Sequence, residues 1–345
     1  MKRLSEPPSA AESMRRIDSL FSCGGLRHSP RRRNSPSPPA QSTHPARKRK
    51  QKPHPSEGPT ETVLRVPEWN SFPWLLHGFS TRRGGVSRIY GDGHCGELNL
   101  GFTPDDSRDN VLENRKIFLQ AVAGGRAGRE QPELALLRQI HSGMIHRLAP
   151  ATQPQRGDGW ITDEPGTWIG VLTADCVPVL VADTRMRIVA AFHAGWRGTL
   201  ARIAERGVGR MRAEFGCRPE DLTTAIGPGI GPCCYSVGEE VRMEFESQFS
   251  YANELFQEVF DLDPIKQKYP MLFLTARAPG HSNLGPSTHL NLPEANRRQL
   301  QDAGIRPDRI YSVGSCTACN TSKFFSHRAQ HGFTGRMMSV IGLAG

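Results

Sequence analysis

The segment of residues 168–200 has the sequence WIGVLTADCVPVLVADTRMRIVAAFHAGWRGTL, and its pattern determines the overall fold. It contains three short apolar runs, residues 168–172, 177–181 and 187–192, and small or polar residues separate them. Runs of this length between turn residues are typical of buried β-strands. The sequence therefore predicts three strands here, and any helices must pack around them.

Amphipathic helices are predicted on both sides of this stretch. Apolar residues recur at helical spacing over residues 110–122, before Gly124, and over residues 199–215, before Gly216. Residues 237–249 keep a four-residue apolar step, and Pro293 suits the first turn of a helix that runs through residue 300. This alternation predicts an α/β or α+β fold with a mixed sheet. No internal repeat and no Pro/Gly linker follows residue 61, so residues 61–345 are expected to form one domain.

The positive charge of the chain is concentrated in residues 1–60. The formal net charge is +10, yet this segment alone holds 13 Lys and Arg against 4 Asp and Glu. It is also rich in Pro and Ser, with Phe21 as its one aromatic residue. Such a segment cannot bury enough apolar surface to offset the entropy of ordering, so we expect a disordered tail. The nearly neutral remainder argues against a nucleic-acid-binding core.

Cysteine content and hydropathy indicate the compartment. The chain has eight cysteines, no apolar signal-peptide core at its start and no run of 18 apolar residues. We therefore expect free thiols, no membrane span and a cytoplasmic location. The Cys316-Thr317-Ala318-Cys319 segment has redox or zinc spacing, but no second pair of that spacing exists to complete a four-sulfur site. Ordinary thiols near a strand end are the favoured interpretation.

Three residues stand out as candidate metal ligands. His141, Cys176 and His193 each lie where an apolar run ends and small or polar residues begin. A set of two imidazoles and one thiolate suits Zn²⁺, and three protein ligands leave the fourth position open, as in catalytic sites. We expect Cys176 to follow the strand that ends at Leu172, and His193 to follow the strand that ends at Phe192.

Blocks of sequence spread over most of the chain resemble the YfiH-like family, whose members carry the names polyphenol oxidoreductase, laccase-domain protein and purine nucleoside phosphorylase. The resemblance runs from about Gly78 to Leu343. It rests on many blocks in one order, among them GFSTRRGGVS at residues 78–87, LNLG at 98–101, ENR at 113–115, DG at 158–159, ADCVP at 174–178, HAGWRG at 193–198, GPGIGPCCY at 227–235, CT at 316–317, FFS at 324–326 and TGR at 334–336.

The resemblance implies a fold, a reaction and a cofactor. The fold is an α/β/β/α layered sandwich. The reaction is phosphorolysis of purine nucleosides such as adenosine, inosine, guanosine and methylthioadenosine, with adenosine deamination as a companion activity. Zn²⁺, or less favourably copper, is the implied cofactor, held by His141, Cys176 and His193. The implied partners are a purine nucleoside and phosphate.

Further residues are candidates for contact with the substrate. Arg197 precedes the helix expected from Thr199, where unpaired N–H groups and the helix dipole favour an anion, so we assign it a catalytic role with Cys176 and His193. Arg82, in an Arg-Arg-Gly-Gly turn, is a candidate for phosphate or ribose binding. Phe324 and Phe325 are candidates for stacking on the base.

Three alternatives stay open at this point. A copper-dependent phenol oxidase matches the laccase name, but multi-copper oxidases use His-X-His pairs and the sequence contains none. A Cys176 nucleophile with His193 as its base is a second enzymatic option. A metal-stabilised nucleic-acid-binding protein led by the basic tail is a non-catalytic third.

Overall fold

The fold comes from a computed structural model that describes residues 61–91, 96–124, 133–148, 155–260 and 286–345. These residues belong to one compact unit, residues 56–345. The tail that we expect to be disordered, residues 1–60, lies outside the described residues.

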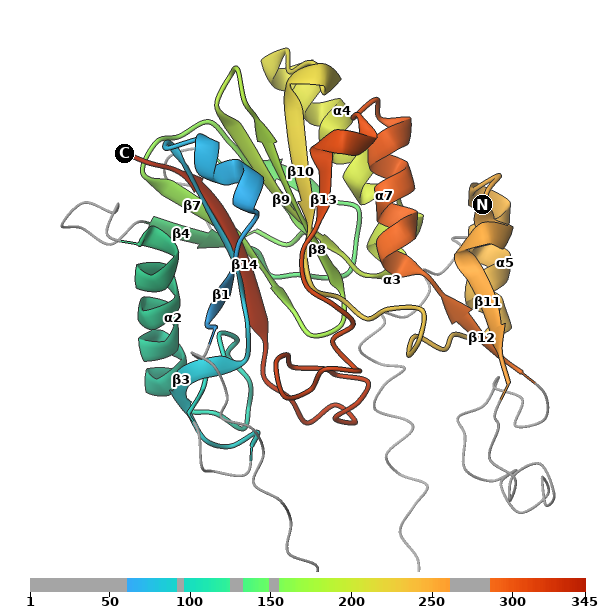
Figure 1. Ribbon diagram of the computed structural model, residues 1–345, viewed down its shortest axis with the longest axis horizontal. Helices are drawn as coiled ribbons and strands as arrows, with labels where there is room; N and C mark the ends of the chain where they lie inside the picture. Colours follow the sequence, from blue (N-terminus) through green and yellow to red (C-terminus); the bar gives the residue numbers. More distant parts are fainter. Residues whose placement is uncertain (1–60, 92–95, 125–132, 149–154, 261–285) are drawn as a thin grey trace, which may run out of the picture. The chain divides into compact units, whose positions relative to one another are not determined.

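Two mixed sheets form the middle of the fold (Figure 1). The five-stranded sheet has the order β1 (Val63–Leu64), β2 (Leu75–Ser80), β14 (Met337–Leu343), β7 (Thr167–Thr173) and β4 (Glu133–Leu136). The six-stranded sheet has the order β13 (Ile310–Ser312), β10 (Leu222–Ile226), β8 (Val177–Asp183), β9 (Ile188–Ala194), β6 (Gly159–Thr162) and β5 (Ile145–Arg147). Each sheet combines parallel and antiparallel pairs.

The remaining elements are short strands and helices. A small antiparallel pair consists of β11 (Phe256–Val259) and β12 (Ser287–Leu290), and β3 (Arg83–Ser87) follows β2. The α-helices are α2 (Arg108–Ala123), α3 (Trp196–Leu200), α4 (Ile203–Phe215), α5 (Glu239–Gln248) and α7 (Leu292–Asp302). The 3₁₀ turns are η1 (Pro67–Ser71), η2 (Pro219–Asp221), η3 (Ala252–Leu255) and η5 (Pro307–Arg309).

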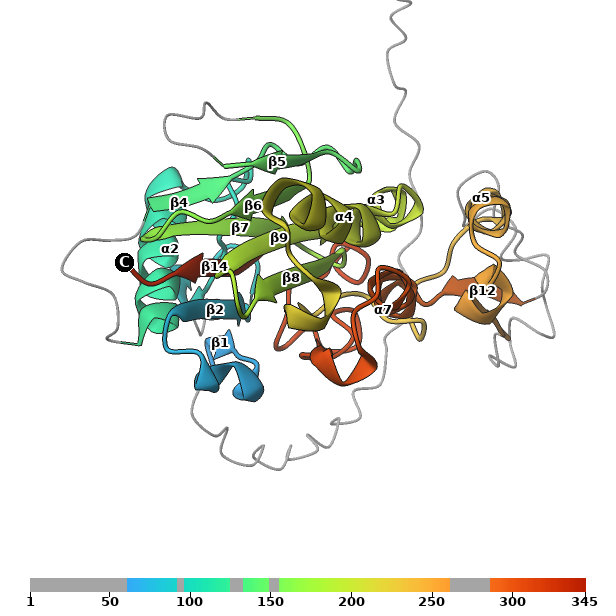
Figure 2. The ribbon, with the colours of Figure 1, turned by 90° about the horizontal axis from the view of Figure 1, so that it is seen from above.

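Three apolar cores separate four layers, which confirms the α/β/β/α arrangement (Figure 2). The middle core joins the two sheets, with side chains such as Ile169 and Val171 of β7 facing Leu180 of β8 and Ala191 of β9. The outer core of the five-stranded sheet lies under α2, and that of the six-stranded sheet lies under α4 and α7; α5, which packs against α3 and η3, also contributes side chains to it. The strands are continuous apolar runs because both faces of each sheet are covered.

The predicted helices form, with one difference. The Ser107 side chain caps α2 by accepting from the Asn110 N–H, and the helix ends at Gly124, whose φ is 55°. The single helix expected over residues 199–215 is wrong: α3 begins at Trp196, and Arg202 has a φ of 57° between α3 and α4. A left-handed residue breaks the helix, and apolar periodicity does not reveal it.

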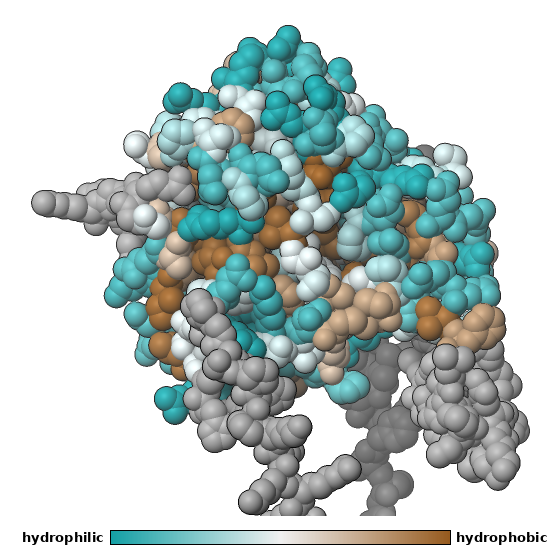
Figure 3. Space-filling view, viewed as in Figure 1, coloured by the Kyte–Doolittle hydropathy of each residue, from teal (hydrophilic) through white to brown (hydrophobic). Residues whose placement is uncertain are grey.

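The face of the molecule that is seen in Figure 3 is mostly hydrophilic. On the face seen in Figure 1, apolar residues gather in a band across the middle and polar residues surround them (Figure 3). Within the described residues, no helix has both the length and the apolar character needed to cross a membrane.

Candidate functional site

The pairing of β8 with β9 and a neighbouring loop bring the three candidate ligands together. Cys176 directly precedes β8, whose first residue pairs with Ala194 of β9. His193 lies within β9, so its expected position after the strand is wrong. His141 lies in the loop between β4 and β5, with a φ of 58°. The ligand atoms of the three residues all lie within 4.8 Å of one another, and this spacing suits a common metal ion.

Asp158 is a buried carboxylate that orients this cluster. It lies just before β6, and its Oδ1 accepts a hydrogen bond from Nδ1 of His193 at 2.8 Å. It also accepts from the backbone N–H of His141 at 3.0 Å, and from the N–H and hydroxyl of Ser142 at 2.6 and 2.7 Å. One side chain therefore fixes both histidines and leaves Nε2 of His193 for a metal, as in carboxylate–histidine–metal sites. The sequence analysis missed this role.

Electrostatics in the cluster favour a thiolate. Burial raises the pKa of the Cys176 thiol, but the neighbouring His193 charge and hydrogen bonds to His141 and His193 lower it to about 6. Burial also opposes the charged form of His193, whose pKa is nevertheless raised to about 9 by the Cys176 and Asp158 charges. Cys176 therefore has the deprotonated form that metal binding requires.

A left-handed residue positions Cys176. Asp175 has a φ of 89°, a conformation that costs free energy for a residue other than glycine. Its carboxylate accepts from the Thr317 hydroxyl and from the Arg328 N–H, both at 2.6 Å. Its carbonyl accepts from the Ile230 N–H at 2.8 Å. Contacts from two distant segments therefore hold the turn that presents Cys176.

Gly195 leaves space for the ligands. A Cβ at this position would lie 3.0 Å from Sγ of Cys176 and 3.2 Å from Cδ2 of His141. The φ of Gly195 is −70°, which any residue can adopt, so space alone requires glycine here.

We expect Gly195→Ala to weaken metal binding about 10-fold or more without unfolding the chain, because a methyl group forces both ligands to move. Competition with a chromophoric chelator measures the affinity. Gly209→Ala is the control, since a Cβ there meets no atom within 4 Å. Equal affinities for the two variants would contradict the steric argument.

The cluster opens into a pocket of about 580 Å³, a size typical of small-molecule sites. His141, Cys176 and His193 line it, and so do polar, cationic and aromatic side chains that the sequence analysis had not assigned to substrate: Phe102, Gln139, Tyr235, His327, Arg328 and Arg336. Arg336 is half-buried, and its guanidinium donates to the carbonyls of Thr334 and Gly335. Two cationic residues, Arg328 and Arg336, therefore lie at the same pocket as the three candidate ligands.

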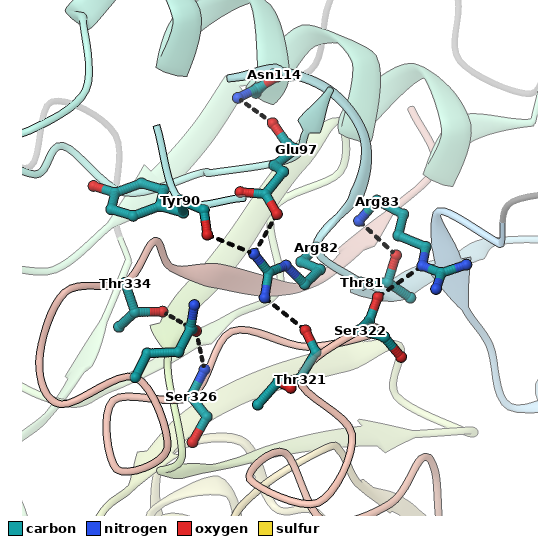
Figure 4. A network of polar contacts seen from close by, with 11 residues as sticks. Thr81, Arg82, Arg83, Tyr90, Glu97, Asn114, Thr321, Ser322, Ser326 and Thr334 are labelled. Atoms are coloured by element: carbon teal, nitrogen blue, oxygen red, sulfur yellow. Dashed lines mark hydrogen bonds and ion pairs between the residues drawn. The ribbon is translucent and has the colours of Figure 1, made fainter. Parts of the chain in front are cut away.

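The other predicted site residues lie outside the pocket lining. Arg197 is exposed within α3, with its guanidinium 4.3 Å from the Trp196 ring. Arg82 forms a buried ion pair with Glu97 and donates to the carbonyls of Thr321 and Tyr90 (Figure 4). Its charge is thus already compensated.

The two phenylalanines do not face the pocket either. Phe324 and Phe325 are fully buried in the core between the sheets. The Phe325 ring lies beneath the Arg82 guanidinium, 4.7 Å away. The aromatic side chains that do line the pocket are Phe102, which is 48% exposed, and Tyr235.

The chain is similar to known proteins over most of its length. The family model described as "Multi-copper polyphenol oxidoreductase laccase" matches residues 76–344. A protein of Deinococcus radiodurans named purine nucleoside phosphorylase is 35% identical over 268 residues, covering 77% of this chain and 88% of that protein. Purine nucleoside phosphorylase YlmD of Geobacillus stearothermophilus is 32% identical, covering 79% and 91%. The crystal structure of YfiH, described as a hypothetical protein of Bacillus licheniformis, matches with a TM-score of 0.66 and 30% identity, covering 82% and 96%.

Proposed function

The chain belongs to the laccase-domain, or YfiH-like, family, and we propose that it is a zinc-dependent purine nucleoside phosphorylase. The observation that carries the proposal is the convergence of His141, Cys176 and His193 at a pocket that also holds two arginines. The names of the relatives supply the substrate class, a purine nucleoside with phosphate.

The donor set fits zinc. Two imidazoles and a thiolate are borderline and soft ligands that Zn²⁺ accepts, and three of them leave one position open toward the pocket. Zn²⁺ bound there would supply Lewis-acid chemistry at its open position. The absence of His-X-His pairs from the sequence makes a multi-copper centre the weaker choice.

Cationic side chains give the pocket its affinity for phosphate. Arg328 and Arg336 line the same cavity as Cys176. An arginine can bind two phosphate oxygens at once, which holds the anion and directs it toward C1′ of the ribose. In the reaction a phosphate oxygen bonds to C1′ while the bond from C1′ to the purine nitrogen breaks. The base leaves with that electron pair and gains a proton.

Other side chains would bind the nucleoside. Burial and the nearby Cys176 charge raise the pKa of Tyr235, so its hydroxyl stays protonated and can donate a hydrogen bond. The ring of Phe102 lines the pocket and is 48% exposed, so the part of the ring that the guanidinium groups of Arg108 and Arg115 leave open would contact the purine. The same site supports adenosine deamination as a companion activity, since attack at C6 of adenine is known chemistry for a zinc site.

To test this function, the protein is incubated with adenosine or inosine, with and without phosphate, and the products are separated. Phosphorolysis requires that free base and ribose 1-phosphate appear only when phosphate is present. Inosine formed from adenosine without phosphate reports the deaminase activity separately. Absence of base release in every condition, together with copper-dependent oxidation of a phenol, would replace the proposal with the oxidase alternative.

The roles of the arginines can be compared directly. Arg336→Ala is expected to raise the KM for phosphate and to cost about 1.5–3 kcal/mol in kcat/KM, the size of one charge-assisted contact, while zinc content stays unchanged. Arg197, predicted from sequence to bind phosphate, lies outside the pocket lining, so Arg197→Ala should cost less. Steady-state kinetics with phosphate as the varied substrate measures both. A larger loss of kcat/KM for Arg197→Ala than for Arg336→Ala would instead indicate that phosphate binds at the start of α3.

A further inference from the structure

Four cysteines from two distant loops form a second cluster. Cys233 and Cys234 lie in the loop after β10, and Cys316 and Cys319 lie in the loop after β13. Their four sulfur atoms all lie within 4.8 Å of one another. Sγ of Cys319 is 3.3 Å from Sγ of both Cys233 and Cys234. The sequence contains no second pair with the spacing of Cys316 and Cys319, but in the fold the adjacent Cys233 and Cys234 provide the other two sulfur atoms.

The sulfur spacing matches a metal site. A Zn–S bond of about 2.3 Å places the sulfur atoms of a regular tetrahedron about 3.8 Å apart. Two of the sulfur–sulfur separations are 3.3 Å and none exceeds 4.8 Å, which is compatible with that value. A disulfide requires an S–S distance of about 2.05 Å, and none of the four cysteines is in a disulfide. The four thiols thus surround one point.

We propose that Cys233, Cys234, Cys316 and Cys319 bind a Zn²⁺ ion in a structural site. Four thiolates occupy all four positions of a tetrahedral ion and leave none for a substrate, which is the mark of a structural zinc. Soft sulfur ligands select zinc over magnesium or calcium. This site has no ligand in common with His141, Cys176 and His193.

A backbone contact in the cluster stabilises a thiolate at Cys316. The backbone N–H of Gly231 donates to Sγ of Cys316 at 3.2 Å, and such contacts stabilise negative charge on sulfur. Gly231 also lies close enough that an added Cβ would meet Cβ of Cys316 at 3.2 Å and Sγ of Cys233 at 3.4 Å. The backbone at Gly231 therefore lies in close contact with the cysteine side chains of the cluster.

The cluster joins two loops that shape the pocket. Next to Cys234 lies Tyr235, which lines the pocket. Next to Cys316 lies Thr317, whose hydroxyl donates to the Asp175 carboxylate and whose N–H donates to the carbonyl of Gly229. A metal ion in the cluster would fix both loops to each other and so support the turn at Asp175.

Metal content and cobalt spectroscopy test the proposal. The full-length protein, purified with a reductant and zinc, is expected to hold one more zinc ion than the double variant Cys316→Ser/Cys319→Ser. The Cys176→Ala variant removes the thiolate of the proposed catalytic site, so that a thiolate–metal signal in this variant reports on the four-cysteine cluster. Cobalt added to that variant should give the intense visible absorption bands and the sulfur-to-cobalt charge-transfer bands of a tetrahedral thiolate site. One equivalent of zinc should abolish both.

The control is Cys217→Ser, which changes a cysteine outside both clusters and should keep the metal content of the wild type. The cobalt readout does not need a stable double variant, because it uses Cys176→Ala alone. Absence of sulfur-to-cobalt bands in Cys176→Ala would overturn the proposal, as would a Cys316–Cys319 disulfide that forms equally well with zinc present. Neither outcome depends on nucleoside turnover, so failure here leaves the phosphorylase proposal standing.

Discussion

Cys176→Ala is expected to lower nucleoside turnover at least about 10²–10³-fold, the loss typical of removing one main electrostatic stabiliser from an active site. The thiolate is the only anionic group among the three proposed ligands. Without it, two imidazoles remain, and they hold Zn²⁺ far more weakly. The zinc content and the initial rate of base release from inosine with phosphate measure the two effects.

The matched control for this variant is Cys217→Ala, which removes the same group from a buried position beside Asp183. That variant is expected to lose stability but to keep its bound metal and its kcat. If Cys176→Ala kept full activity with its metal lost, the site would not be the catalytic centre. Retention of both metal and activity would rule out Cys176 as a ligand.

Asp158→Asn is expected to reduce zinc affinity about 10- to 100-fold, the usual effect of altering the hydrogen-bond partner of a metal-binding histidine. The amide of asparagine presents one oxygen instead of two. It therefore cannot accept from His193 and from the N–H groups of His141 and Ser142 together. Chelator competition at neutral pH measures the affinity.

The same variant changes the acid stability of the metal-free protein. Burial raises the pKa of Asp158, but hydrogen bonds from His193 and Ser142 lower it from 3.8 to about 2. Because the folded pKa is depressed, its contribution to the free energy of unfolding is fully present above about pH 4 and is lost as the pH falls toward 2. The contribution is on the order of 2 kcal/mol. Urea unfolding at several pH values should show a flatter pH dependence for Asp158→Asn.

The control for Asp158 is Asp163→Asn, since Asp163 pairs with Arg147 at the surface and its loss should cost less than about 1 kcal/mol. A wild-type curve that is no steeper than that of Asp158→Asn between pH 2 and 4 would contradict the assigned role.

The sequence predicted the strands well and the helix after β9 less well. The apolar runs at residues 168–172, 177–181 and 187–192 correspond to β7, β8 and β9 because burial on both faces requires unbroken apolar residues. The break at Arg202 could not be predicted. Its left-handed backbone is held by hydrogen bonds from its side chain to Glu205 and to the carbonyl of Gln248, contacts that exist only in the folded chain.

The sequence predicts those parts of the candidate site that depend on the residue type and its neighbouring motif. Ligand type and motif context identified His141, Cys176 and His193, and the structure brings them together. The orienting role of Asp158 depends on the pairing of β6 with β9, which no local pattern encodes. Aromatic content alone did not distinguish the buried Phe324 from the exposed Phe102.

The central place of β14 has a consequence for folding kinetics. This strand, residues 337–343, lies between β2 and β7, and the Met338 N–H donates to the hydroxyl of Ser80, 258 positions earlier. Pairings of such high contact order must pay the entropy of closing a long loop before they gain any contact, and they make folding slow. During synthesis, β2 and β7 therefore leave the ribosome long before the strand that joins them. Until then their apolar edges are exposed, and this interval is when the nascent chain is most prone to aggregate and most dependent on chaperones.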